Sequence, residues 1–328
     1  MLVNSETALN FLTDLKDYCL EYQIENIFSG GDFFHTKARA YAPHVIQALL
    51  RLKDIHKAGI KQHMLVGNHD MSNPDNSMNS ILFTFSDYVK VIPDYYFFDS
   101  GGTRIHFLSY TNKLFENFIL AEGKKNILIA HLDILGFTMP NGFASKSGFK
   151  RDDFKDFDLV ISGHYHKHQS QENIVYVGSP YQTNFAERDQ PHGFLIVDSD
   201  TATWEFIEYL KAPKYKVITV NKLSDINTDN LYGNFIKIKL VSHKISKSKL
   251  RERLYDLGAR SADVIPPEDV KEIEKYYDNT FGEEPSQVAL SYINNIRSLD
   301  INKDELLEYF TKIEEFATNM SEFELDEV

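Results

Sequence analysis

Four short apolar runs in this chain each end at or beside glycine, histidine, aspartate or asparagine. They are NIFSGGDFFH at residues 26–35, HMLVGNHD at 63–70, NILIAH at 126–131 and LVISGHYH at 159–166. Short runs rich in β-branched residues are typical of buried strands. In open α/β sheets, ligands bind outside the carboxyl ends of such strands. The four runs therefore predict one shared site at the ends of four strands.

Helix and strand signals alternate around these runs. Apolar stripes predict helices at residues 5–22 and 41–58, the second of which ends at Gly59. Strands are predicted at 24–28, 62–66, 88–92, 104–110, 126–130, 158–162, 174–178, 193–197 and 203–209. This density of strands favours two sheets packed face to face with helices outside, which is an α/β sandwich.

The composition changes after about residue 210, and we expect three parts: a main domain at 1–210, a small α+β cap at 211–270 and a helical region at 271–328. The cap contains predicted strands at 214–220 and 235–240 and a helix at 246–257. Its basic cluster is Lys244, Lys247, Lys249, Arg251 and Arg253. Such a cluster is either a solvated helix face or a DNA contact. The last region carries two apolar helical stripes, which either pack within the chain or dock on a partner helix.

Composition excludes several classes of protein. No run approaches the roughly 18 apolar residues that a membrane span needs. The lone Cys19 cannot form an intramolecular disulfide, and the start of the sequence has no secretory pattern, so we expect a reducing cytoplasm. The formal net charge of −13 disfavours broad nucleic-acid binding. Bound divalent cations would reverse that charge locally, so a phosphate substrate remains compatible.

The residue types in the four runs suit a pair of metal ions. Two cations about 3.5–4 Å apart need a bridging carboxylate, and Asp32 is the acid placed to provide it. Neutral histidine and amide ligands complete the two shells without repelling a phosphate. These ligands are Asn68, His131, His164 and His166.

His69 follows Asn68 and therefore points in a different direction. We interpret it as an acid toward the leaving oxygen or as a clamp on the phosphate, with Asp70 fixing its tautomer. The remaining histidines lack a motif and are expected to lie at the surface or to be hydrogen-bonded. They are His44, His56, His63, His106, His168, His192 and His243.

The motifs Gly-Asp-x-x-His, Gly-Asn-His-Asp, a lone strand-end His and Gly-His-x-His resemble those of calcineurin-like metallophosphoesterases. Within that superfamily, His35 is similar to the histidine of the SbcD branch of DNA nucleases, where many phosphatases have Asp. The segments at 176–181 and 193–198 also resemble the SbcD strand pair that follows the last metal motif. The length and the segment at 292–296 look most like the recombination-nuclease subunit of tailed bacteriophages.

The resemblance implies a four-layer sandwich of two mixed sheets and a Mn²⁺-dependent DNA exonuclease and endonuclease, with Mg²⁺ as the other candidate ion. Asp32 would bridge two divalent cations. Asn68, His131 and His164 would hold the second cation, and His166 would contribute to the first. His69 and His35 would contact or orient the scissile phosphate.

The resemblance also implies partners. An SbcC-type ATPase would bind the helices of 271–328, and DNA would be the substrate. A homodimer would form through residues 41–58 and 77–87. A phage-encoded member would act in the host cytoplasm.

The family also has a strand that ends in Asp-x-His upstream of the position of Asp32, and this sequence has none there. The Asp54-Ile55-His56 segment is no substitute, because residues two apart on a helix face different directions. We expect a misassigned start or a fragment rather than a naturally degenerate enzyme. Two alternatives to a nuclease stay open: a phosphoesterase that acts on a nucleotide or phosphoprotein, and a catalytically impaired scaffold that recruits the ATPase.

Overall fold

The computed structural model describes residues 2–34, 41–71, 77–111, 117–139, 142–222, 225–226, 231–241 and 245–266. The chain divides into two units, Met1–Lys239 with Lys244–Ile265 and Leu240–His243 with Pro266–Val328. The predicted helical region at 271–328 lies outside the described residues. The predicted boundaries after residues 210 and 270 remain predictions.

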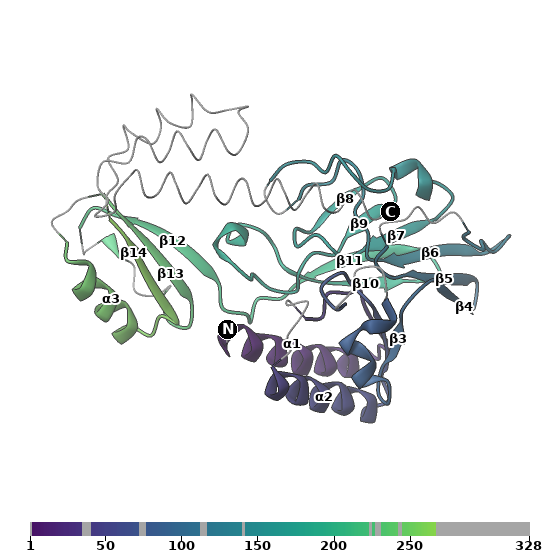
Figure 1. Ribbon diagram of the computed structural model, residues 1–328, viewed down its shortest axis with the longest axis horizontal. Coiled ribbons are helices and arrows are strands. Elements are labelled where there is room, and N and C mark those ends of the chain that lie inside the picture. The colour runs from purple at the N-terminus through teal and green to yellow at the C-terminus, as the bar shows by residue number, and fades with distance from the viewer. Residues whose placement is uncertain are drawn as a thin grey trace, which may run out of the picture. The chain divides into compact units, whose positions relative to one another are not determined.

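The larger sheet has six strands in the order β4-β5-β6-β7-β9-β8 (Figure 1). Their bounds are Tyr96–Ser100 (β4), Thr103–Leu108 (β5), Lys125–Ala130 (β6), Leu159–Ser162 (β7), Gln169–Gln171 (β8) and Ile174–Tyr176 (β9). Strands β5, β6, β7 and β9 run parallel, whereas β4 and β8 are antiparallel edge strands. The carboxyl ends of the central strands therefore lie at one edge of the sheet.

A second, parallel sheet has the order β1-β2-β3, formed by Asn26–Ser29, Lys61–Leu65 and Lys90–Ile92. Helices α1 (Leu2–Glu21) and α2 (Ala42–Lys57) lie side by side in Figure 1. On α2, Ala48 and Leu52 pack in one core with Met64 of β2. Cys19 of α1 is 3% exposed and lies in one buried cluster with Ile55 of α2.

The two sheets pack face to face through alternate residues of their strands. Leu65 and Ile92 share a buried cluster with Phe107 and Ile129 of the larger sheet. Residues 128 and 130 of β6 point to the other face and join a cluster with Phe137 and Phe154. A hairpin of β10 (Gly193–Asp198) and β11 (Thr203–Glu208) packs its Leu195 and Trp204 near Ile161. The predicted α/β sandwich is confirmed.

Short 3-10 helices lie in the connections. They are Ser77–Asn79 (η1), Ile81–Phe85 (η2), Arg151–Phe154 (η3) and Phe185–Glu187 (η4). A further sheet, β12-β13-β14, is formed by Tyr215–Val220, Phe235–Leu240 and Ser261–Ile265, together with helix α3 (Lys247–Asp256). Leu250 and Leu254 are the buried residues of α3, and its basic side chains at 247, 249, 251 and 253 are exposed.

Strands β4, β8 and β14 were not predicted from the sequence. Each is short, and β8 and β14 carry polar residues at most positions that face away from the core. The predicted elements occur with bounds shifted by one to three residues, as is usual where helices and strands fray. Within the described residues, no helix has both the length and the apolar character to cross a lipid bilayer.

Candidate metal centre

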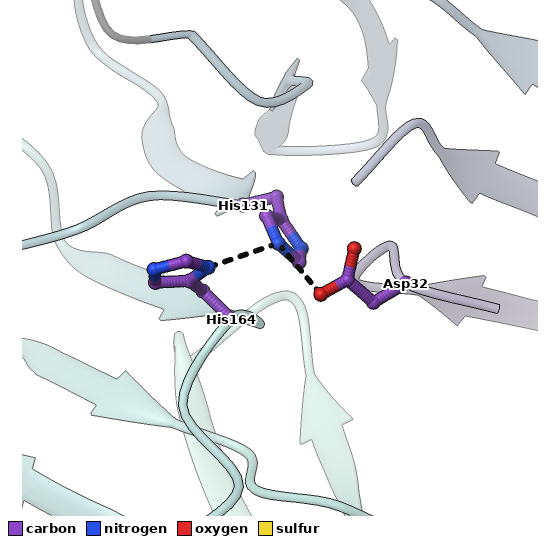
Figure 2. Close-up of side chains that lie close together, drawn as sticks. All are labelled: Asp32, His131 and His164. Atoms are coloured by element: carbon purple, nitrogen blue, oxygen red, sulfur yellow. Dashed lines mark hydrogen bonds and ion pairs between the residues drawn. The ribbon is translucent and has the colours of Figure 1, made fainter. Parts of the chain in front are cut away.

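Four polar side chains converge from the carboxyl ends of four strands. Asp32 follows β1, Asn68 follows β2, His131 follows β6 directly and His164 follows β7. Figure 2 shows the His131 ring between the Asp32 carboxylate and the His164 ring. The ligand atoms of these three residues all lie within 4.8 Å of one another. The structure therefore brings together the four residues that the sequence assigned to one cation.

The contacts among these side chains have the spacing of a coordination shell. His131 Nε2 lies 3.4 Å from Asp32 Oδ2 and 3.1 Å from Asn68 Oδ1. His164 Nδ1 lies 3.2 Å from Asn68 Oδ1 and 3.3 Å from His131 Nε2. Adjacent ligands of one cation at about 2.1 Å would be separated by roughly 3.0–3.4 Å. The four atoms thus suit a single divalent cation.

The orientation of His131 makes its Nε2 an acceptor. Its side chain is fully buried, and Nδ1 donates to the carbonyl oxygen of Gly30 at 2.6 Å. A neutral imidazole that donates from Nδ1 keeps its lone pair on Nε2. Nε2, the Asp32 carboxylate and the Asn68 carbonyl then point electron pairs at one another, an arrangement that a cation stabilises.

Glycines allow this close approach. A Cβ at Gly67 would lie 2.2 Å from Asp32 Oδ1, and a Cβ at Gly163 would lie 2.2 Å from the carbonyl oxygen of Gly30. Asp32 and His164 themselves have φ values of +56° and +86°, in the left-handed region that non-glycine residues rarely adopt. Backbone strain of this kind concentrates at functional sites and indicates that surrounding contacts hold both ligands in place.

Two ligands have protonation states that suit metal binding. Burial and, to a smaller extent, the nearby His131 lower the pKa of His164 to about 4, so His164 is neutral near pH 7. Burial acts to raise the pKa of Asp32, but interactions that include the hydrogen bond from the backbone N–H of His69 leave it below its ordinary value. The site therefore combines an ionised Asp32 carboxylate with a neutral His164 imidazole.

His166 lies beside this cluster, and its ring is held by a different residue. Its Nδ1 contacts Oε1 of Glu187 at 2.8 Å, and that hydrogen bond raises the pKa of His166. The negative charge of the Asp32 carboxylate also acts to raise the pKa of His166. Among the described residues, His166 is not within the 4.8 Å group of Asp32, His131 and His164. Its assignment to a first cation remains a prediction.

Asp70 makes contacts that the sequence did not suggest. Its carboxylate accepts hydrogen bonds from the backbone N–H groups of Phe33, Phe34 and Gly67 at 3.0–3.3 Å. Burial raises its pKa to about 6 despite those hydrogen bonds. Asp70 thus ties the loop after β2 to the loop after β1. That it also fixes the tautomer of His69 remains a prediction.

His69 and His35 complete the predicted set. The backbone N–H of His69 donates to Asp32 Oδ1 at 2.8 Å, which places His69 at the edge of the site. Its roles as acid or phosphate clamp remain predictions. His35 lies outside the described residues.

Four residues that contact the site were missed from the sequence. Glu187 holds His166, and the Tyr165 hydroxyl donates to the carboxylate of Asp133, which joins the loops of His164 and His131. The Tyr110 ring packs near both His131 and His164, with ring centroids 6.0 and 6.1 Å away. None of these residues stands in a recognisable motif, and only their proximity in the fold identifies them.

Two other histidines make hydrogen bonds within the fold, as expected from the sequence. His168 Nδ1 donates to the carbonyl oxygen of Tyr176 at 3.0 Å, and its ring stacks on Phe206. His106 is fully buried between Tyr95 and Asn126, with one ring nitrogen on each.

Comparison with known proteins gives a family match and several relatives. Residues 7–168 match the calcineurin-like phosphoesterase family. The chain is 26% identical to exonuclease subunit 1 of Enterobacteria phage T4 over 194 residues, which is 56% of this chain and 54% of that protein. It is 29% identical to the D subunit of nuclease SbcCD from Staphylococcus saprophyticus over 202 residues, 56% of this chain and 53% of the relative.

A third relative is matched over more of its length. The chain is 30% identical to putative phosphoesterase 244L of Invertebrate iridescent virus 6 over 240 residues, which covers 67% of this chain and 83% of the viral protein. By contrast, the chain spans about half the length of the phage and bacterial nuclease subunits that it matches.

Proposed function

The chain belongs to the calcineurin-like phosphoesterase family, and from this membership we propose that it is a metal-dependent nuclease subunit that hydrolyses phosphodiester bonds of DNA. One observation carries the proposal: four ligand atoms from the ends of β1, β2, β6 and β7 converge with 3.1–3.4 Å between neighbours. A set of acceptors so close together is suited to a divalent cation and to phosphate chemistry.

We assign two cations, Mn²⁺ or Mg²⁺, to this site. Asp32, Asn68, His131 and His164 would hold one, and Asp32 and His166 would contribute to the other. When bound, such cations supply Lewis acidity and make a water molecule acidic enough to act as a nucleophile near neutral pH. The chain's own residues set the geometry for this chemistry, chiefly through the hydrogen bond from His131 to Gly30.

His69 is the residue that we propose to act on the leaving group. The backbone N–H of His69 donates a hydrogen bond to Asp32, so the His69 side chain extends from the edge of the site. A histidine there can protonate the leaving oxygen as the phosphorus–oxygen bond breaks, or contact the phosphate. His35 would orient the same phosphate. Asp70 supports this arrangement by holding the loops that carry Asp32 and His69.

DNA is favoured as the substrate by the nature of the relatives. One is named as a subunit of an exonuclease, and another is named as a subunit of the SbcCD nuclease. We therefore propose that the chain acts with an SbcC-type ATPase bound by the helical region 271–328, as a homodimer formed through residues 41–58 and 77–87. The cap at 211–270 would lie next to the DNA. The complex would act in DNA recombination and repair in the cytoplasm.

A phosphoesterase with a smaller substrate is the second candidate. The relative from Invertebrate iridescent virus 6, matched over 67% of this chain and 83% of its own length, is described only as a putative phosphoesterase. A scaffold with little activity is the third, because Asp32 and His166 alone are assigned to the first cation. Both alternatives predict weak or absent cleavage of DNA.

The test is cleavage of linear duplex DNA by the full chain with Mn²⁺ or Mg²⁺, with and without chelator. We expect cleavage that stops with chelator and falls at least about 100-fold in His69→Ala, the size of a typical general-acid contribution. Lys155→Ala is the control, because Lys155 is exposed and lies outside every segment to which a role is assigned. Efficient hydrolysis of small phosphate diesters without any cleavage of DNA would favour the second candidate.

A further inference from the structure

The ring of His166 is held by a buried carboxylate, Glu187, that has no lysine or arginine partner among the described residues. Glu187 is 5% exposed and accepts from His166 Nδ1 at 2.8 Å through Oε1. It lies at the end of η4, 21 residues after His166 in the chain. A buried carboxylate is costly unless its oxygens are hydrogen-bonded, so its contacts identify what it is placed to do.

Besides His166, two neighbouring residues donate hydrogen bonds to the Glu187 carboxylate. Oε2 accepts from the backbone N–H of Thr183 at 2.6 Å, and Oε1 accepts from the side-chain amide of Asn184 at 2.9 Å. The Thr183 hydroxyl donates to the same carboxylate. An ionised carboxylate can only accept, so the ring nitrogen that faces it carries the proton. His166 therefore keeps its proton on Nδ1, and in the neutral ring the lone pair lies on Nε2.

The backbone of His166 is held as well. Its carbonyl oxygen accepts from the backbone N–H of Ser179 at 2.9 Å. Gly178 has φ +82°, and a Cβ there would lie 2.8 Å from that same oxygen. The segment at 176–181, which the sequence related to SbcD proteins without a role, thus fixes the main chain at His166 while Glu187 fixes its ring.

We propose that Glu187 is a positioning residue that locks His166 in the Nδ1–H tautomer, so that the Nε2 lone pair is available to a divalent cation beside Asp32. This inference rests on the proposed metal-dependent function, which it deepens by naming the residue that prepares His166. Carboxylates that hold the second nitrogen of a ligating histidine are a common way to fix ring orientation.

The substitution Glu187→Gln tests the tautomer directly. The backbone N–H of Thr183 cannot rotate, so it keeps the glutamine oxygen at the Oε2 position. The glutamine NH₂ then takes the Oε1 position and donates to His166 Nδ1, while the exposed Asn184 side-chain amide, which donates to Oε1 in the unchanged chain, turns toward solvent. The ring must respond by moving its proton to Nε2, which removes the lone pair that the cation needs.

We would measure the His166 tautomer by ¹⁵N NMR of the metal-free full chain and Mn²⁺ binding by calorimetry. The unchanged chain should show an Nδ1–H ring and two bound ions. Glu187→Gln should show an Nε2–H ring and a roughly 10- to 100-fold loss in affinity for one ion, with the other unaffected. Glu172→Gln is the matched control, since its side chain is 68% exposed and it pairs with Arg151.

An Nε2–H ring in the unchanged chain would overturn the proposal, and this readout does not require the variant to fold. The proposal would also be overturned if Glu187→Gln bound both ions with the same affinities as the unchanged chain. The proposed function fails separately, if the chain binds two ions and leaves phosphodiesters intact. In that case the tautomer and affinity results still decide the role of Glu187.

Discussion

The Nδ1–H of His131 donates to the carbonyl oxygen of Gly30 across 2.6 Å, and this hydrogen bond joins the two sheets at the site. His131 directly follows β6 of the larger sheet, whereas Gly30 follows β1 of the smaller one. Gly163, which follows β7, packs against the same carbonyl. The position of a single backbone oxygen thus sets the spacing between ligands that come from different sheets.

Gly163→Ala should disrupt that spacing. The new Cβ would lie 2.2 Å from the Gly30 oxygen and 3.1 Å from His131 Nδ1, so the loop must move. We expect a loss of about 1–3 kcal/mol in the free energy of unfolding, as for other overpacked sites. A shift of this kind in the ligands should also lower Mn²⁺ affinity by roughly 10- to 100-fold in calorimetry.

Gly102→Ala is the control for this substitution, because a Cβ there meets nothing within 4 Å and its φ is not positive. It should leave both the unfolding free energy and the Mn²⁺ affinity near those of the unchanged chain. Normal Mn²⁺ affinity in Gly163→Ala would show that the contact with Gly30 does not govern the site.

Asp70→Asn should loosen the two loops that Asp70 connects. Both carboxylate oxygens accept from backbone N–H groups, so an amide NH₂ would face a donor that cannot turn away. An unpaired buried donor costs about 1–3 kcal/mol, and we expect a loss of that size in chemical denaturation. Asp87→Asn, at an exposed position, should have little effect. An unchanged stability in Asp70→Asn would mean that the hydrogen bonds contribute nothing net.

The ligands could be predicted from the sequence because each one follows an apolar run. Asp32, Asn68, His131 and His164 need only the rule that the carboxyl ends of parallel strands share one edge of a sheet. The α/β sandwich followed from the same runs, because their number and length favour two stacked sheets. Each of these predictions needs only one strand and the residues that directly follow it in the sequence.

The supporting residues could not be predicted in that way. Glu187 lies 21 residues beyond His166, and no periodicity connects them. Asp70 was interpreted through its neighbour His69, whereas its carboxylate contacts loops 36 and 37 residues away. Strand β14 carries only Ala262 and Val264 as buried residues, so its signal was too weak to separate it from a loop. Contacts of this kind depend on how the loops pack.

His63 should make the fold sensitive to acid. It lies between the rings of Phe28, Phe98 and Phe107, and burial, with Lys90 and Lys61 nearby, lowers its pKa from 6.5 to about 4. The unfolded chain takes up this proton at a higher pH than the folded chain. Stability should therefore fall as the pH drops from about 6.5 toward 4, by roughly 2 kcal/mol after allowance for partial exposure of the ring.

His63→Phe removes the titrating group and keeps an aromatic ring among Phe28, Phe98 and Phe107. Urea denaturation at pH 7 and pH 5 should show a smaller decrease in this variant than in the unchanged chain. His56→Phe, at an exposed position of α2, should keep the original decrease. If His63→Phe loses stability on acidification as steeply as the unchanged chain does, the pH dependence has another source.

Asn68→Leu should separate metal binding from stability. We expect it to lower the affinity for Mn²⁺ without lowering the melting temperature of the metal-free chain. Asn68 Oδ1 lies 3.1 Å from His131 Nε2, and both atoms are acceptors when His131 is neutral with its proton on Nδ1. An apolar side chain of similar size removes that repulsion, so the metal-free variant should melt at the same temperature or higher.

Saturating Mn²⁺ should raise the melting temperature of the unchanged chain, since an ion at 100 times its Kd contributes about 2.7 kcal/mol. The variant should lose most of this increase, and chelator should abolish it in the unchanged chain. A fall in stability without Mn²⁺, with the Mn²⁺-dependent increase retained, would instead show that Asn68 is a structural residue and not a ligand.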